Sequence, residues 1–204
     1  MESGSAREVV VAVTGASGAP YAKRVVEGLA AAGCRVHVTL SPTGADIYRQ
    51  ETGRRFDPER PRAEELFDGV PPGSVVFHPV SQVGASIASG SFRTIGMAIV
   101  PCSAGTLARV AGGYSVNLID RAADVHLKEK RRLVVVLRET PLNDIQIENI
   151  ARLSRAGACV LPACPGFYHR PERVEDLVDF VAARVLDQLG VDNDLSRRWG
   201  ERRS

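Results

Sequence analysis

The chain has 204 residues, of which 44% are hydrophobic and 25% charged, an ordinary composition for a globular protein. Its 26 basic and 24 acidic residues leave a net charge of +2, which gives no global field to attract nucleic acid or an anionic membrane. No apolar run approaches the roughly 20 residues of a membrane span, so we expect a single cytoplasmic domain over residues 1–204, with no nucleic-acid or membrane partner.

Apolar, β-branched runs alternate with helical patterns along the whole chain. The predicted strands are 8–14, 34–40, 75–78, 97–100, 132–138 and 158–161. The predicted helices are 21–32, 44–52, 63–67, 103–110, 118–129, 142–156 and 172–189. This alternation indicates βαβ units, and therefore an α/β fold with a doubly wound, mostly parallel sheet and helices on both faces. The last helix is amphipathic, with an apolar side formed by Val174, Leu177, Val178, Val181, Val185 and Leu189.

The cysteines and histidines do not suggest a metal site. Cys34, Cys102, Cys159 and Cys164 form no CxxC pair, and the four histidines are scattered. We expect no bound metal, and buried or partly buried thiols in a reducing compartment.

Small and hydroxylated residues follow three of the predicted strands. Ligands of open parallel sheets bind beyond the carboxyl ends of the strands. The three turns are Thr14-Gly-Ala-Ser-Gly18, Ser41-Pro-Thr43 and Pro101-Cys-Ser-Ala-Gly-Thr106. Each alone fits a plain turn or helix cap, but together they favour a cradle for a phosphate or a flavin phosphate. The first turn lacks GxGxxG and no turn carries Gly-Lys-Ser/Thr, which argues against a dinucleotide fingerprint and a P-loop.

Charged and aromatic groups follow the remaining strands. Arg138 and Glu139 come directly after an apolar strand, where they either serve a ligand or form an exposed ion pair. In the first case the carboxylate is both desolvated and held by the neighbouring cation. The last strand leads to Tyr168, and Arg184 lies beside the apolar side of the last helix, where it either faces solvent or a ligand.

With these strand ends laid side by side, the chain resembles the UbiX flavin prenyltransferase family over residues 8–200. The matching segments are 14–18, Ser41, 88–92, 101–106, 121–124, 127–129, 138–141, 165–169 and Arg198-Trp-Gly200. The resemblance implies a flavodoxin-like or Rossmann-like single flavin-binding domain. It also implies transfer of a dimethylallyl group from dimethylallyl phosphate to reduced FMN, with bonds at flavin N5 and C6 and without a metal. The product, prenylated FMN, would serve a UbiD-type decarboxylase.

The resemblance also implies roles for individual residues. FMN would be held by Gly15, Ala16, Ser17, Ser41, Ser103, Ala104, Gly105, Thr106 and Arg138. The prenyl phosphate would be held by Lys128, Tyr168 and Arg184, with Arg121 nearby. Glu139, as the proton carrier, and Glu51 would lie near the reacting groups, and Ser17 and Lys128 would complete the catalytic set. The loop 88–92 would order over the substrate. Family members are dodecamers with sites at subunit contacts, so a homododecamer is expected.

Two alternatives remain open at this point. A flavin-dependent cysteine decarboxylase shares the fold, but it carries a Pro-x-Met-Asn motif where this chain has Pro101-Cys-Ser. A non-catalytic FMN-binding partner protein would bind flavin without turnover, and would leave Lys128, Glu139, Tyr168 and Arg184 without a purpose.

Overall fold

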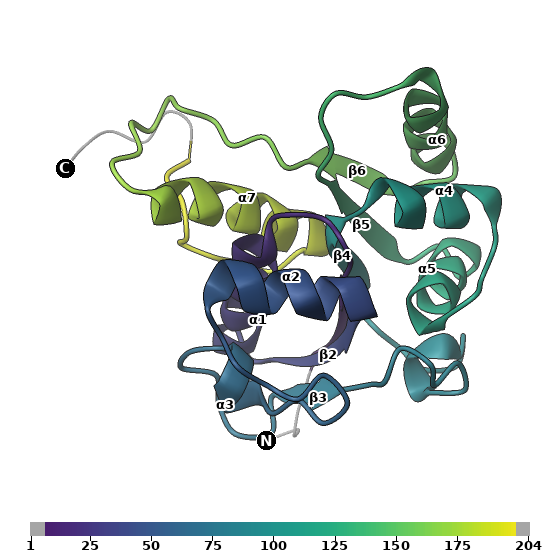
Figure 1. The fold of residues 1–204 in the computed structure, drawn as a ribbon, viewed down its shortest axis with the longest axis horizontal. Coiled ribbons are helices and arrows are strands. Elements are labelled where there is room, and N and C mark those ends of the chain that lie inside the picture. The colour runs from purple at the N-terminus through teal and green to yellow at the C-terminus, as the bar shows by residue number, and fades with distance from the viewer. Residues whose placement is uncertain (1–6, 199–204) are drawn as a thin grey trace.

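The structure, a computed structural model, describes residues 7–198 and is built on one six-stranded parallel sheet (Figure 1). The strand order is β3-β2-β1-β4-β5-β6. The strands are β1 (Arg7–Val13), β2 (Cys34–Leu40), β3 (Val75–Phe77), β4 (Gly96–Cys102), β5 (Arg132–Leu137) and β6 (Cys159–Pro162). The chain winds outward from β1 in one direction and from β4 in the other, so the strand order reverses between these two strands.

Helices cover both faces of the sheet. They are α1 (Ala19–Ala31), α2 (Pro42–Thr52), α3 (Ala63–Leu66), α4 (Ala104–Gly112), α5 (Leu118–Lys128), α6 (Asp144–Arg155) and α7 (Val174–Leu189). A 3-10 turn (Ser86–Ala88), which the sequence did not predict, precedes β4. The predicted α/β fold, doubly wound with a parallel sheet, is confirmed.

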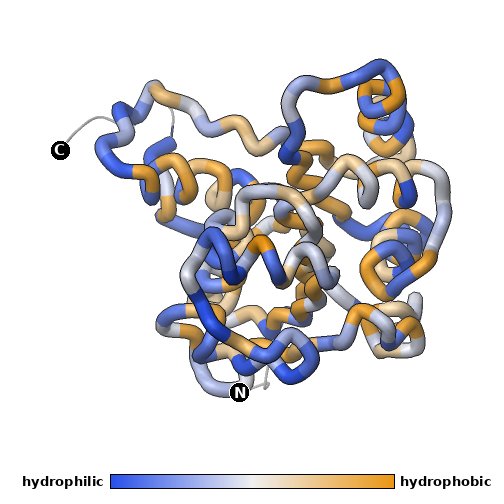
Figure 2. Tube along the Cα trace, viewed as in Figure 1, coloured by the Kyte–Doolittle hydropathy of each residue, from blue (hydrophilic) through white to orange (hydrophobic). Residues whose placement is uncertain are grey.

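Two hydrophobic cores lie on opposite faces of the sheet. Val9 and Val11 of β1 point into one core with α1, α2 and α7, while Val10 and Ala12 point into the other with α4, α5 and α6. Because the central strands are buried on both faces, they read as continuous apolar runs in the sequence. Along the helices, hydrophobic and hydrophilic positions alternate, as expected where one side packs on the sheet (Figure 2).

Two sequence predictions about burial are wrong. Val174 is 70% exposed, because the first turn of α7 extends beyond the part of the helix, from Val181 onward, that is buried in the core. Cys164 is exposed rather than buried, because it follows the edge strand β6, whereas Cys34 and Cys102 are buried. All four thiols are free.

Within residues 7–198, no group of three or more His, Cys, Asp or Glu side chains is placed to hold a metal ion. None of the helices in this range is long and apolar enough to cross a membrane. Trp199 and Gly200 of the motif at the end of the chain lie outside the described residues.

Candidate active site

Thr14 joins the ends of β1 and β4, where the strand order reverses. Its Oγ1 donates a hydrogen bond to the carbonyl of Pro101 and accepts one from the N–H of Ser103, both at 2.8 Å. The loop after β1 and the start of α4 are therefore held side by side. This is the topological switch point, at which open α/β sheets bind their ligands.

The neighbouring strand ends continue the same edge. The N–H of Ser41 donates to the carbonyl of Val13 at 2.9 Å, and that of Arg138 donates to the carbonyl of Cys102 at 3.2 Å. The ends of β2, β1, β4 and β5 thus follow one another along one edge of the sheet. This edge carries every residue expected to hold FMN: Gly15, Ala16, Ser17, Ser41, Ser103, Ala104, Gly105, Thr106 and Arg138.

Two of the helices that begin at this edge, α2 and α4, have serine caps. Ser41 Oγ accepts the N–H of Gly44 at 3.0 Å, and Ser103 Oγ accepts the N–H of Thr106 at 3.3 Å. Both serines are therefore N-caps, as the plainer interpretation of these turns held. The remaining first-turn N–H groups of α2 and α4 have no intrahelical acceptor, which leaves them available to an anion.

Close backbone approach explains two of the small residues. A Cβ on Gly15 would lie 2.8 Å from the side chain of Thr43, and a Cβ on Gly44 would lie 2.6 Å from the carbonyl oxygen of Val13. Neither position has room for a side chain. The glycines therefore bring the loop after β1 against α2 and form a narrow cradle lined by backbone.

An ion pair between Arg109 and Asp120 contacts the cradle at Thr106. Arg109 donates through Nε to Asp120 Oδ2 at 2.8 Å and through Nη2 to Thr106 Oγ1 at 3.1 Å. The Asp120 side chain is fully buried, whereas that of Arg109 is 32% exposed. Arg109 thereby links a buried carboxylate to a hydroxyl of the cradle, a connection that the sequence did not indicate.

Glu51, at the end of α2, caps the start of α1. Its Oε2 accepts the N–H groups of Gly18 and Ala19, both at 2.8 Å. Partial burial opposes ionisation of this carboxyl, but hydrogen bonds from Ser17 and the two N–H groups, with the charge of Arg138, hold its pKa below the usual range. Glu51 is thus an ionised group beside the cradle, and it also fixes the loop that carries Ser17.

Arg138 contains a buried polar atom without a partner. Its Nε is shielded from solvent and makes no hydrogen bond to any residue in 7–198. Buried donors of this kind are almost always satisfied in folded proteins. The cradle therefore fits a ligand that supplies an acceptor, and the anionic, oxygen-rich FMN molecule meets that need.

Glu139 is exposed in the single chain. The expectation that it is desolvated beside Arg138 is therefore wrong for one subunit, because β5 ends at Leu137 and the chain then leaves the sheet. Its Oε1 accepts the N–H of Thr140 at 3.1 Å.

Tyr21 is a member of this region that the sequence did not identify. It lies in the first turn of α1, and a Cβ on Gly18 would lie 2.9 Å from its ring. Burial raises the pKa of Tyr21, and the nearby Cys164 and Glu51 raise it further. Its hydroxyl therefore stays protonated close to Glu51. An aromatic hydroxyl soon after a small-residue turn was the available signal.

Tyr168 and Arg184 line one small cavity of about 130 Å³ at the outer side of α7. The Tyr168 ring packs edge-on against Phe180, with 5.7 Å between ring centroids, and Arg184 follows Phe180 by one helical turn. The structure thus places these two predicted phosphate ligands together.

Lys128 and Arg121 lie elsewhere. Both are on α5, which packs in the core opposite to that of α7 (Figure 1). Lys128 Nζ lies 3.7 Å from Glu129 Oε1, and Arg121 Nη1 lies 3.1 Å from Asp124 Oδ2. One chain therefore does not bring these cations to Tyr168 and Arg184. Lys128 is also separated from Glu139 by the length of β5, about 20 Å at 3.3 Å per residue.

The loop 88–92 lies at the end of α5 that carries Lys128, because a Cβ on Gly90 would meet the side chain of Glu129. The Arg131 guanidinium donates to the carbonyls of Gly90 and Phe92, which fixes the loop beside the start of β5. This is the edge of the sheet opposite to the cradle. The expectation that the loop covers the substrate is therefore wrong within one chain.

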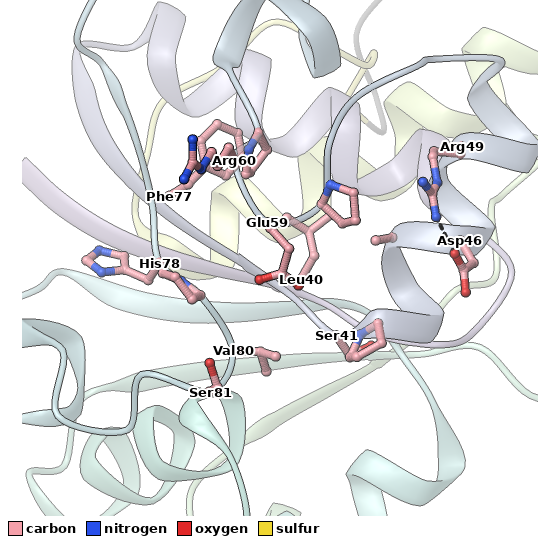
Figure 3. A pocket seen from close by; sticks show the side chains of 15 residues that line it. Leu40, Ser41, Asp46, Arg49, Glu59, Arg60, Phe77, His78, Val80 and Ser81 are labelled. Carbon is pink, nitrogen blue, oxygen red and sulfur yellow. Dashed lines mark hydrogen bonds and ion pairs between the residues drawn. The ribbon is translucent and has the colours of Figure 1, made fainter.

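A larger cavity, of about 370 Å³, adjoins the cradle at Ser41 (Figure 3). It lies between the start of α2, the end of β3 and the loop around Glu59, with an Asp46–Arg49 ion pair on its α2 side. Of the predicted site residues, only Ser41 lines it. Because Arg138, Glu51 and Tyr168 lie outside this cavity, we do not assign the chemistry to it.

A small-residue cradle at the crossover of a parallel sheet, with helix N-termini and the unsatisfied Arg138 beside it, suits a phosphate-bearing cofactor such as FMN. In agreement, residues 2–186 match the model of the Flavoprotein family. This match defines the general class of the chain.

Comparison with individual proteins narrows the class. The flavin prenyltransferase UbiX of Halalkalibacterium halodurans is 48% identical over 193 residues, which cover 95% of this chain and 93% of that protein. The chain belongs to the UbiX family of flavin prenyltransferases.

Solved structures agree with this assignment. The crystal structure of AnUbiX in complex with FMN and dimethylallyl pyrophosphate has a TM-score of 0.87 at 38% identity, covering 98% of this chain and 100% of that one. A dodecameric FMN-dependent UbiX-like decarboxylase from Escherichia coli O157:H7 has a TM-score of 0.83 at 39% identity, covering 95% and 100%.

Proposed function

We propose that this protein transfers a dimethylallyl group from dimethylallyl phosphate to reduced FMN, and that the prenylated FMN is used by a UbiD-type decarboxylase. The observation that carries the proposal is the cradle at the switch point, in which Arg138 Nε is buried without a partner. Membership of the flavin prenyltransferase family supports the same reaction.

The cradle would hold FMN through backbone and short side chains. The first turns of α2 and α4 offer N–H groups to an anionic phosphate, and Arg138 offers its unsatisfied Nε. Reduced FMN supplies the nucleophilic ring atoms N5 and C6. Ser17 is hydrogen-bonded to Glu51, so the loop after β1 is held in one conformation against the ligand.

The donor's phosphate would be bound by Tyr168 and Arg184. As the allylic carbon–oxygen bond breaks, negative charge builds up on the phosphate oxygens, and a guanidinium stabilises that charge most strongly in the transition state. The tyrosine hydroxyl donates a hydrogen bond without adding charge. Glu139, exposed at the end of β5, would take up the proton that ring closure releases.

Lys128 and Arg121 would reach the phosphate from a neighbouring copy of the chain. Their position on α5, across the sheet from α7, excludes them from the phosphate cavity of their own chain. A neighbouring subunit would also cover Glu139 and bring the loop 88–92 over the site. We propose a homododecamer, by similarity to the dodecameric relative.

We place the reaction in the cytoplasm. The four free cysteines suit a reducing compartment, and the reaction itself needs FMN in its reduced form.

Anaerobic incubation with reduced FMN and dimethylallyl phosphate tests the proposal. Mass analysis of the extracted flavin should show the addition of one dimethylallyl group, with release of inorganic phosphate. The matched control uses oxidised FMN and should give no product. Tight FMN binding without consumption of the donor would instead identify a non-catalytic flavin-binding protein. Oxidative decarboxylation of a peptide that ends in cysteine would identify a cysteine decarboxylase.

A further inference from the structure

Asp187 of α7 is bonded to two arginines from different parts of the chain. Arg184 Nη1, one turn earlier on the helix, lies 3.1 Å from Asp187 Oδ2. Arg198 reaches both carboxylate oxygens, with Nη1–Oδ2 at 3.3 Å and Nη2–Oδ1 at 3.0 Å. One carboxylate therefore holds two guanidinium groups.

The path of the chain after α7 explains how Arg198 returns to the helix. Gly190 ends α7 in the left-handed conformation, with φ of 74°, and Val191, which is 2% exposed, re-enters the core. Asn193 then donates to Asp187 Oδ1 at 3.1 Å and accepts the N–H of Leu195 at 3.4 Å. Asp187 is thereby fixed by a side-chain amide as well as by the two arginines.

The arginines line the cavity that contains Tyr168. Its lining includes three guanidinium groups, of Arg184, Arg197 and Arg198, against the single carboxylate of Asp187. Ser196 Oγ also belongs to this lining; it is buried and has no hydrogen-bond partner within residues 7–198. A cavity of about 130 Å³ with excess positive charge and an unsatisfied hydroxyl fits a phosphate group.

Guanidinium groups bind phosphate best when their planar forks are already oriented. Arg184 and Arg198 are about half exposed, at 51% and 55% of their side chains, so without a partner each would sample many rotamers. Asp187, at 19%, is the least exposed of the three. Asp187 therefore holds the guanidinium groups of Arg184 and Arg198 in fixed orientations.

We propose that Asp187 is a positioning residue of the prenyl-donor site and that Arg198 is a second guanidinium contact for the donor's phosphate beside Arg184. The inference rests on the proposed function, which places that phosphate at Tyr168 and Arg184.

The variant Asp187→Asn separates positioning from simple attraction of charge. If the cluster acts only by its charge, removing the carboxylate makes the cavity more positive and tightens phosphate binding. If Asp187 positions the arginines, the variant leaves both guanidinium groups without a fixed orientation, and phosphate binding weakens. We expect KM for dimethylallyl phosphate to rise by about ten- to a hundredfold, the size of losing one charge-assisted hydrogen bond to the phosphate, with FMN affinity unchanged.

The matched control is Asp179→Asn. Asp179 also lies on α7 and pairs with an arginine, Arg24, at 2.5 Å, and its side chain is 24% exposed. The control therefore removes a similar ion pair from the same helix without touching the cavity. It should leave KM for the donor near the wild-type value. Arg198→Ala should raise KM as Asp187→Asn does, while circular dichroism verifies that all variants are folded.

Calorimetric titration of the FMN-loaded protein with inorganic phosphate measures the same site without turnover. Wild type and Asp179→Asn should bind phosphate, and Asp187→Asn and Arg198→Ala should bind it at least about tenfold more weakly. Equal or tighter binding by Asp187→Asn would overturn the inference, as would a wild type that forms prenylated FMN but binds no phosphate. If wild type shows the expected binding pattern but forms no prenylated FMN, the proposed function fails and the phosphate site stands.

Discussion

Replacing Arg109 by methionine should destabilise the protein far more than replacing its partner Asp120 by asparagine. The two side chains share one ion pair but differ in exposure, at 32% for Arg109 and 0% for Asp120. Without Arg109, the buried carboxylate keeps only the N–H of Val116 at 3.3 Å on Oδ2, and its Oδ1 has no partner among the described residues. Without the Asp120 charge, the arginine can still turn to water.

The magnitudes follow from that difference. Removing one partner of a buried pair and leaving a buried charge costs about 3–5 kcal/mol. For a chain of this size, that loss lowers Tm by about 6–20 °C. Asp120→Asn keeps an acceptor oxygen for Arg109, so only the charge assistance of a hydrogen bond is lost, about 1–2 kcal/mol. The double variant Arg109→Met/Asp120→Leu leaves no buried charge and should recover most of the loss.

Urea unfolding at pH 7.5, monitored by circular dichroism, gives the free energy of unfolding of wild type, the two single variants and the double variant. These four values form a double-mutant cycle. FMN titration of the same proteins should show weaker binding by Arg109→Met, because Arg109 also holds Thr106 Oγ1 at 3.1 Å. The reasoning would be refuted if the two single variants lost equal free energies of unfolding. It would also be refuted if the double variant lost the sum of the two single losses, because the buried carboxylate would then not depend on Arg109.

Three further predictions concern single residues. Glu139→Gln should keep FMN binding but lower the rate of product formation by about a hundredfold; near-normal turnover would make its role structural. The pKa of His126 is lowered by burial from its usual 6.5, and its ring nitrogens bond Thr94 and a backbone carbonyl. The free energy of unfolding should therefore be fully maintained above pH 6.5 and decrease as pH falls below that value. His126→Gln should make the free energy of unfolding less dependent on pH between 7.5 and 5.5. If the variant shows the same pH dependence as wild type, His126 is not the group responsible. Gly44→Ala should lower the free energy of unfolding by about 1–3 kcal/mol through overpacking, because the new Cβ would lie 2.6 Å from the Val13 carbonyl oxygen. The control Gly112→Ala, whose Cβ would have no atom within 4 Å, should not lower the free energy of unfolding measured in urea.

The cradle could be predicted from the sequence because its geometry follows from the topology alone. Carboxyl ends of parallel strands meet at one edge, so the small residues after β1, β2 and β4 had to lie together once the strands were identified. The strands themselves were recognisable because residues such as Val9 and Val10 are buried on opposite faces.

Other features depend on packing that a one-dimensional pattern does not contain. Glu51 caps a helix that begins 32 residues before it, and Asp120 reaches Arg109 across two helices. The placement of Lys128 away from Arg184 follows from which face each helix covers, and a helix can cross on either side of a sheet. The family resemblance marked Lys128 as a phosphate ligand, but the order of residues along the chain did not indicate from which copy it acts.

The location of α5 and α7 over opposite faces of the sheet has a consequence for mixtures of variants. If Lys128 of one copy completes the cavity of another, then Lys128→Ala and Arg184→Ala damage different halves of each site. Either protein alone would have every site impaired. In a randomly coassembled equal mixture, about one site in four would combine an intact Arg184 with an intact Lys128 from its neighbour. Activity regained on mixing two inactive proteins would thus reveal the subunit contact without any structure of the assembly.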